Sequence, residues 1–188
     1  MIAEPFDAVL GAARTGADWA WERIYDALAP AVLGYLRARG AADPDGVCGD
    51  VFCQVVRDIH RFEGDEAGFR SWVFVIAHHR MLDDTRRRQR RPETLAGPEA
   101  FGGLTDPVDV ERDAIRSEQE AQIRRLIDEL TPTQRDVLLL RIFGGLTIDE
   151  IARAVGKRPG AVKALQRRAL EALRRRIGDP YLPAAEER

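Results

Sequence analysis

Hydrophobic residues in the last third of the chain recur at helical spacing in two consecutive segments. In the first segment the apolar positions are Ile148, Ile151, Ala152 and Val155, at i, i+3, i+4 and i+7. In the second segment they are Val162, Leu165, Ala169, Leu173 and Ile177. The pattern predicts two amphipathic helices that each turn one face toward a core.

The ends of these two helices are marked by residues with defined capping roles. Thr147 and Glu150 stand three residues apart, so each side chain can bond to the backbone amide of the other residue. Gly156 follows the first stripe directly and can end that helix in the left-handed conformation. Pro159 suits the first position of the next helix. The sequence therefore predicts a helix, a tight glycine turn and a second helix.

A second helix pair is predicted immediately upstream. Its apolar stripe consists of Ile123, Leu126, Ile127 and Leu130. Thr131 and Gln134 then repeat the spacing of a capping box, and Pro132 stands at the first helical position. We therefore expect a C-terminal unit of four helices, with the most basic helix last.

The first 92 residues are also predicted to be helical. Residues 21–39 form one periodic segment that ends at Gly40, and Asp43 with Pro44 starts the next. Residues 60–68 form a loop, and the segment 69–91 after it is apolar first and basic at its end. From residue 92 to about 110, prolines, glycines and acidic residues replace the periodic pattern, which disfavours a regular helix.

These patterns predict an all-α fold of two small helical domains joined by a flexible linker. The expected boundaries are 1–92 for the first domain, 93–117 for an acidic linker, 118–178 for the second domain and 179–188 for a tail. A length of 188 residues is enough for two small domains, and a hydrophobic content of 45% supports packed cores.

Charge along the chain is segregated, although the net charge is only −2. Nine lysines and arginines and one acidic residue lie between Arg153 and Arg176, and the run 86–91 holds five arginines. Residues 99–120 hold seven acidic residues and two arginines. Because salt screens charges beyond about 8–10 Å, local patches rather than the average decide whether phosphate is bound.

Composition and motifs argue against a secreted, membrane-spanning or catalytic protein. We expect no signal peptide, no membrane span and a cytoplasmic location, because long apolar runs are missing and Cys48 and Cys53 form no CxxC pair. His78, His79, Asp83 and Asp84 could suggest metal or acid–base chemistry, but the sequence contains no HExxH, P-loop or Gly-x-Ser-x-Gly motif. We therefore expect no cofactor, no metal and no catalytic activity.

The C-terminal helix pair has the features of a DNA-reading helix-turn-helix. Two helices joined by a tight glycine turn, with a basic second helix, are typical of that motif. An ordinary amphipathic pair with a solvated charged face is the alternative, and the helix start at Thr131 upstream favours the DNA-binding interpretation.

Two segments together resemble the sigma-70 family of bacterial RNA polymerase sigma factors, in its small extracytoplasmic-function (ECF) group. The C-terminal unit resembles their sigma-four domain. The middle segment resembles the end of their sigma-two domain through Phe69, Arg70, Trp72, Val73, Ile76, Ala77 and Asp83. The resemblance implies an initiation subunit that binds the polymerase core, at the clamp of the largest subunit and the flap of the second-largest, and reads the −10 and −35 promoter elements.

Candidate site residues follow from the two segments. For the −35 element they are Lys157, Arg158, Lys163, Gln166, Arg167 and Arg168. For the −10 element they are Arg70, Trp72, His78, His79, Arg80, Asp83, Arg86 and Arg87, with the loop 63–68 as the rim of a pocket for an unstacked base. The resemblance assigns Asp50, Phe52, Gln54 and Arg57 to contact with polymerase.

The chain departs from the family pattern at three positions. Gly46 and Gly49 replace an acidic residue and a glutamine on the helix that the family uses against polymerase, and His79 replaces an asparagine. Each glycine costs a helix interior roughly 1 kcal/mol. An anti-sigma factor is a further possible partner, and a stand-alone helix-turn-helix regulator that does not engage polymerase is the alternative function.

Overall fold

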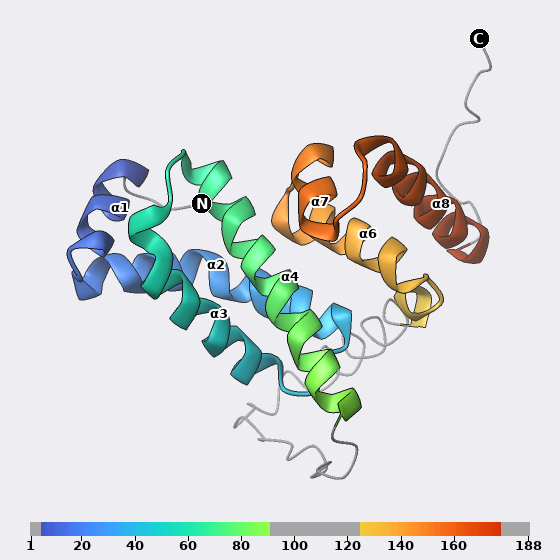
Figure 1. Ribbon diagram of the computed structural model, residues 1–188, viewed down its shortest axis with the longest axis horizontal. Helices are drawn as coiled ribbons and strands as arrows, with labels where there is room; N and C mark the ends of the chain where they lie inside the picture. The colour runs from blue at the N-terminus through green and yellow to red at the C-terminus, as the bar shows by residue number, and fades with distance from the viewer. Residues whose placement is uncertain (1–4, 91–124, 178–188) are drawn as a thin grey trace, which may run out of the picture.

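The computed structural model describes residues 5–90 and 125–177, which are helical throughout apart from short turns. The helices are α1 (Phe6–Arg14), α2 (Asp18–Arg39), α3 (Pro44–Asp58), the 3-10 turn η1 (Ile59–Arg61), α4 (Glu66–Arg90), α6 (Pro132–Gly144), α7 (Ile148–Val155) and α8 (Pro159–Ile177). Figure 1 shows two groups, α1–α4 and α6–α8, lying side by side. The expected all-α class is confirmed; the expected linker 93–117 and tail 179–188 lie outside the described residues.

Helix α2 packs against the three other α-helices of the first group. It begins at Asp18, three residues before the predicted start, and ends as predicted at Gly40, whose φ of 84° lies in the left-handed region. Ile24, Val32 and Leu36 are fully buried. Tyr25, which shares their periodic pattern, is instead 49% exposed, and its ring makes a tilted contact with Phe52 of α3.

The start of helix α3 explains one of the two unusual glycines. Pro44 takes the first position, and the Asp43 carboxylate accepts a hydrogen bond of 2.8 Å from the Gly46 amide. A Cβ atom at Gly46 would lie only 2.1 Å from that carboxylate, so the glycine makes room for the cap. Gly49 has open space around it.

Helix α4 is the longest described element and lies on the side of the first group that faces α6 and α7. Asp65 caps it through a 2.8 Å bond from the Gly68 amide. Phe69, Val73, Ala77 and Met81 recur every fourth residue and are buried. Its exposed faces therefore carry the polar and basic side chains.

Both predicted capping boxes are present in the second group. Thr131 pairs with Gln134 at the start of α6, and Thr147 pairs with Glu150 at the start of α7. Gly156 ends α7 with a φ of 65°, as the pattern predicted. Residues Val162 and Ala169 of α8 are fully buried, so α8 presents its other faces outward.

The two groups share one hydrophobic core. Helix α6 packs against both α2 and α4, and α7 touches α4. A single buried cluster runs from Val9 in α1 to Val162 in α8. Only Leu130, Leu138 and Ala169 form a separate small cluster in the part of the chain that the structure describes. The sequence predicted two helical units but not that they pack on each other.

The two glycines of α3 predict opposite responses to alanine. Gly49→Ala should raise the free energy of unfolding by roughly 1 kcal/mol, because the new methyl meets no neighbour and helix propensity improves. Gly46→Ala should give no such gain, because its methyl displaces the Asp43 cap, which contributes about 1 kcal/mol. Urea unfolding followed by circular dichroism measures both. An equal gain in both variants would contradict this account of the cap.

Candidate nucleic-acid interfaces

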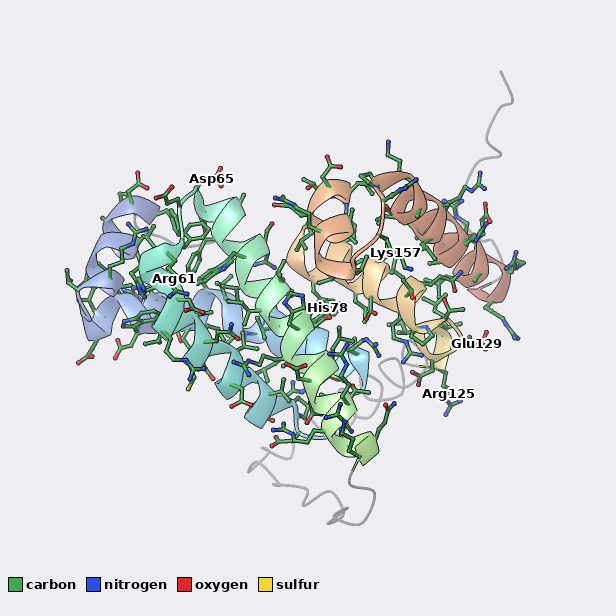
Figure 2. All side chains as sticks on the ribbon, in the orientation of Figure 1. Arg61, Asp65, His78, Arg125, Glu129 and Lys157 are labelled. Atoms are coloured by element: carbon green, nitrogen blue, oxygen red, sulfur yellow. The ribbon has the colours of Figure 1, made fainter. Side chains whose placement is uncertain are left out.

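The turn between α7 and α8 carries the first basic surface. Lys157 and Arg158 are exposed on this turn, and Figure 2 shows Lys157 at the junction of the two helices. Together with Arg153 of α7 they line an open hollow of about 390 Å³. Arg153 was not among the predicted site residues. The sequence could have indicated Arg153, because it lies four residues, or about one helical turn, before Lys157.

Helix α8 separates its predicted contact residues onto different faces. Lys163 and Arg167 are four residues apart, so they share an outward face, and both are exposed. Gln166 flanks the buried stripe and is half-buried. Arg168 is exposed about 100° further round the helix from Arg167. Arg167 and Lys163 are therefore the best placed of the four to enter a groove together.

The first turn of α8 is narrow because its residues are small. Pro159, Gly160 and Ala161 are exposed, and no atom lies within 4 Å of the position of a Cβ on Gly160. The amide groups at a helix start attract phosphate, and small side chains let a phosphate approach them closely. The predicted cations at 157 and 158 stand beside this turn.

Helix α4 presents a second exposed stripe. It runs along the helix through Trp72, His79, Asp83, Arg86 and Arg90, which follow each other at steps of three, four or seven residues. Arg86 lies 3.4 Å from Asp83. Near the helix end Asp83, Arg86, Arg87 and Arg90 line an open hollow of about 420 Å³. Four of the eight predicted −10 residues thus share one outward face.

Arg80 and Arg87 flank this stripe on the side of α3. Arg80 donates a 2.9 Å hydrogen bond from Nε to the side-chain oxygen of Gln54. Arg87 pairs with Asp84 at 3.1 Å and keeps most of its side chain exposed. The bond between Arg80 and Gln54 joins a predicted DNA contact to a predicted polymerase contact.

Arg70 and His78 lie on a different face, which is directed toward α6. The Arg70 guanidinium donates to the Phe143 carbonyl and lies 5.3 Å from the centre of the Phe74 ring. His78 is only 2% exposed, and its Nδ1 lies 3.1 Å from the Tyr35 hydroxyl. In this conformation His78 is not available to a nucleic acid and Arg70 is half-buried, and the structure does not bring them together with the exposed stripe.

The environment of His78 favours its neutral form. Burial is the largest effect and lowers its pKa below the ordinary value, Asp136 opposes that shift, and His79 and Arg39 reinforce it. Burial also raises the pKa of Tyr35, the hydroxyl partner of His78, with a further contribution from Asp136. The surroundings of His78 therefore favour a neutral imidazole next to the protonated Tyr35 hydroxyl.

Trp72 belongs partly to the core and partly to the surface. Its ring lies 5.4 Å from Phe62 and 5.6 Å from Phe69, and the residue is half-buried. Close by, the loop before α4 and helix α2 border a hollow of about 450 Å³. Its lining residues are Ala27, Leu28, Asp65, Glu66, Ala67, Phe69 and Arg70. The predicted pocket rim 63–68 thus adjoins a mainly apolar hollow.

Helix α3 carries the residues that the resemblance assigned to polymerase. Asp50 and Arg57 are exposed and Gln54 is half-buried, whereas Phe52 is only 8% exposed, and its ring centre lies 4.8 Å from that of Tyr25 in a tilted contact. The apolar atoms at this surface come instead from Tyr25 and from Val56, which is 50% exposed. Periodicity alone could not find Tyr25, because the same spacing also marks core residues.

Residues 5–90 and 125–177 were compared with the side-chain groups that hold metal ions and with the helices that cross membranes. These residues contain no group of three or more His, Cys, Asp or Glu side chains that could hold a metal ion. Cys48 is buried, and burial followed by the charge of Asp45 raises the pKa of its thiol to about 11. No helix in the same ranges is long and apolar enough to cross a membrane.

Both segments match described protein families. Residues 24–91 match Sigma-70 region 2, and residues 120–173 match Sigma-70, region 4. The first match covers α3, α4 and most of α2, and the second covers α6, α7 and most of α8.

Relatives of similar length match nearly the whole chain. The ECF RNA polymerase sigma factor SigD of Mycobacterium tuberculosis is 31% identical over 94% of this chain and 86% of its own. RpoE of Cereibacter sphaeroides is 30% identical over 84% of this chain and 86% of its own. The solved structure of CnrH in complex with the cytosolic domain of CnrY shares the fold, with a TM-score of 0.65, 21% identity and coverage of 95% and 100%.

The buried imidazole predicts a pH dependence of stability. Because the pKa of His78 is lowered on folding, its contribution is fully present above about pH 6.5 and is lost as the pH falls through the folded-state pKa. His78→Gln should therefore lose less stability than the parent protein between pH 8 and pH 5.5. Urea unfolding at several pH values measures the difference.

His60 supplies the matched control because it is exposed on η1. His60→Gln should keep the pH dependence of the parent protein. An identical pH dependence in His78→Gln and the parent would contradict the assignment to His78.

Proposed function

The chain belongs to the extracytoplasmic-function sigma factors of the sigma-70 family. On this premise we propose which of its surfaces bind polymerase and which bind each promoter element. Helix α3 would bind the clamp of the largest polymerase subunit, α4 the −10 element, and α7 with α8 the −35 element and the flap of the second-largest subunit. The observation that carries the proposal is the presence of two separate exposed basic surfaces, one in each matched region.

For the −35 element, α8 would lie in the major groove of duplex DNA. Lys163 and Arg167 share its outward face and would reach base edges, where an arginine can bond two atoms of one guanine. Arg153, Lys157 and Arg158 would contact phosphates beside the first turn of α8. Gln166 and Arg168 would contact the groove walls from either side.

For the −10 element, the stripe on α4 would follow a single strand. His79, Arg86 and Arg87 supply polar and cationic groups along one side of the helix, and part of the Trp72 ring is available for stacking. An unstacked base would enter the hollow beside residues 63–68. Arg70 already lines this hollow, whereas the buried His78 would join the surface only after the contact between α4 and α6 is broken.

The polymerase surface of α3 would combine charge with apolar contact. Asp50 and Arg57 supply charge, and Tyr25 and Val56 supply exposed apolar atoms next to them. Phe52 would act through Tyr25, because the tilted contact between the two rings helps to hold the exposed ring in place. Gly49 leaves open space at this surface for the partner to approach.

The remaining assignments follow from family membership. The family consists of initiation factors without catalysis, so we expect no cofactor. We expect a cytoplasmic location, where the polymerase and promoter DNA are found. An anti-sigma protein that covers α2, α3 and α8 would suit the exposed apolar and basic surfaces, and CnrH, which shares the fold, was solved in complex with the cytosolic domain of CnrY.

A reconstitution experiment tests the proposed function. The purified chain should form a stable complex with core polymerase and support transcripts from defined start sites, which are identified by mapping transcripts after overexpression. Binding to duplex DNA without any complex with polymerase would instead support the stand-alone regulator. Absence of both would contradict DNA recognition altogether.

The outward face of α8 predicts a specific loss of promoter affinity. Lys163→Ala combined with Arg167→Ala should weaken holoenzyme binding to the −35 duplex by roughly 30-fold or more, because two good base contacts at about 1–3 kcal/mol each together contribute at least about 2 kcal/mol. Lys157→Ala should instead lower the slope of log affinity against log salt by about 0.9, as expected for one lost phosphate contact. Fluorescence anisotropy at several salt concentrations measures both.

Arg61 provides the control for lost positive charge. It is exposed on η1 and pairs with Asp58 at 3.8 Å, on the opposite side of the molecule from α8 in Figure 2. Arg61→Ala should leave the −35 affinity unchanged. Equal losses in Arg61→Ala and in the α8 variants would mean that general charge, not the α8 face, governs binding.

A further inference from the structure

Helix α1 carries none of the proposed polymerase or promoter contacts. It also lies outside residues 24–91, the segment that matches Sigma-70 region 2. Val9, Leu10 and Ala13 are buried, and the helix packs against α2 and the 3-10 turn η1. Figure 1 shows α1 at the end of the first group, beside the turn that leads into α4. The helix is therefore next to the loop that precedes α4.

Arg14, the last residue of α1, contacts two backbone carbonyl groups where this loop begins. Its guanidinium donates from Nη2 to the Phe62 carbonyl, and its Nε lies 3.5 Å from the Ile59 carbonyl oxygen. A planar guanidinium holds two acceptors in a fixed geometry, which a flexible ammonium group does not. Arg14 therefore helps to fix the direction in which the chain leaves η1.

The loop after Phe62 is folded closely around the ring of that residue. A Cβ atom on Gly64 would lie 3.1 Å from the end of the ring, and one on Gly68 would lie 3.8 Å from it. Gly64 has a φ of 144°, a conformation that residues with a side chain rarely adopt. The position of Phe62 therefore determines the position of the loop 63–68.

The ring of Phe62 also packs against one wall of the hollow proposed for an unstacked base. Its centre lies 5.1 Å from that of Phe69, which lines the hollow together with three residues of the loop. Phe6 of α1 contacts the same wall, with its ring centre 5.6 Å from that of Phe69. Helix α1 thus supports the hollow twice, through Phe6 at the wall and through Arg14 at the start of the rim.

We propose that Arg14 is a positioning residue for base capture, which holds the start of the loop 63–68 so that this loop and Phe69 form a preshaped pocket for the unstacked −10 base. The consequence for promoter binding rests on the proposed function, whereas the hold on the loop is a property of the free chain. A preformed pocket binds more tightly, because its loop loses less conformational freedom when the base enters.

Hydrogen exchange of the full chain measures the hold on the loop. The amides of Phe62, Gly68 and Phe69 all donate hydrogen bonds in or beside the loop, so their exchange reports how often it opens. Arg14→Met should speed this exchange about 10-fold or more, because hydrogen bonds from a charged donor contribute at least that factor to local stability.

Two further variants separate the geometry of Arg14 from its charge. Arg61→Met removes a positive charge from η1, where Arg61 pairs with Asp58 at 3.8 Å, and should behave like the parent. Arg14→Lys keeps the charge but loses the planar fork, so it should restore only part of the slow exchange. Circular dichroism and urea unfolding check that each variant is folded.

Holoenzyme binding to a single strand measures base capture. The probe is the nontemplate strand of the −10 element from a promoter with a mapped transcript start, either intact or with one base removed. In the parent, removal of the captured base should weaken binding roughly 5-fold or more, which is the contribution of one stacked base. Arg14→Met should weaken binding of the intact strand by a similar factor and leave binding of the strand without this base nearly unchanged. Fluorescence anisotropy measures both.

The outcomes separate the role of Arg14 from the proposed function. Faster loop exchange in Arg14→Met, with a loss of affinity confined to the intact strand, would support the proposal. Unchanged exchange, unchanged affinity, or an equal loss on both strands, as for a direct phosphate contact, would overturn it and leave the function standing. Full recovery by Arg14→Lys, or an equal effect of Arg61→Met, would also overturn it.

Two results for the parent protein bear on the proposed function itself. Failure to form a holoenzyme would contradict the function, while faster loop exchange in Arg14→Met would still support the hold on the loop. A parent holoenzyme that binds every strand with a missing base as tightly as the intact strand would contradict the pocket, and with it the positioning role of Arg14.

Discussion

The packing of α6 against α2 and α4 is the contact on which the arrangement of the molecule depends. It merges two helical units into one core and places an ion pair, Arg39 with Asp136, where little water reaches it. Such a pair adds little net stability compared with apolar groups of the same size, yet it is costly to break from one side. Loss of either partner alone would therefore destabilise the packed arrangement.

The same contact explains why the predicted DNA residues fall into separate groups. Along α4, the outward stripe from Trp72 to Arg90 remains exposed, while Arg70 and His78 turn toward α6. On α8, Val162 and Ala169 define the buried face, and helix geometry then determines which lysines and arginines point outward. The second half of the chain thus exposes its predicted DNA-reading surface while it covers part of the predicted surface on the first half.

Local features of the fold could be read from the sequence because their physical causes are local. The capping boxes at Thr131 and Thr147 and the left-handed glycines at 40 and 156 each involve residues a few positions apart. The contact of Gly34 with Phe143 joins residues more than a hundred positions apart and leaves no periodic signal. His78 lies in a polar, basic stretch that favoured solvent exposure, and only tertiary packing buries it.

The distance between the two halves, in the free chain and on the promoter, tests this account most directly. Dyes can be attached at Arg61→Cys and Arg175→Cys after Cys53→Ser, because the remaining thiol of Cys48 is 1% exposed with a pKa raised to about 11. We predict high energy transfer in the free chain and a large fall when core polymerase and promoter DNA are added. Unchanged transfer in the holoenzyme would contradict the account, since both elements would then have to be read without separation of the halves.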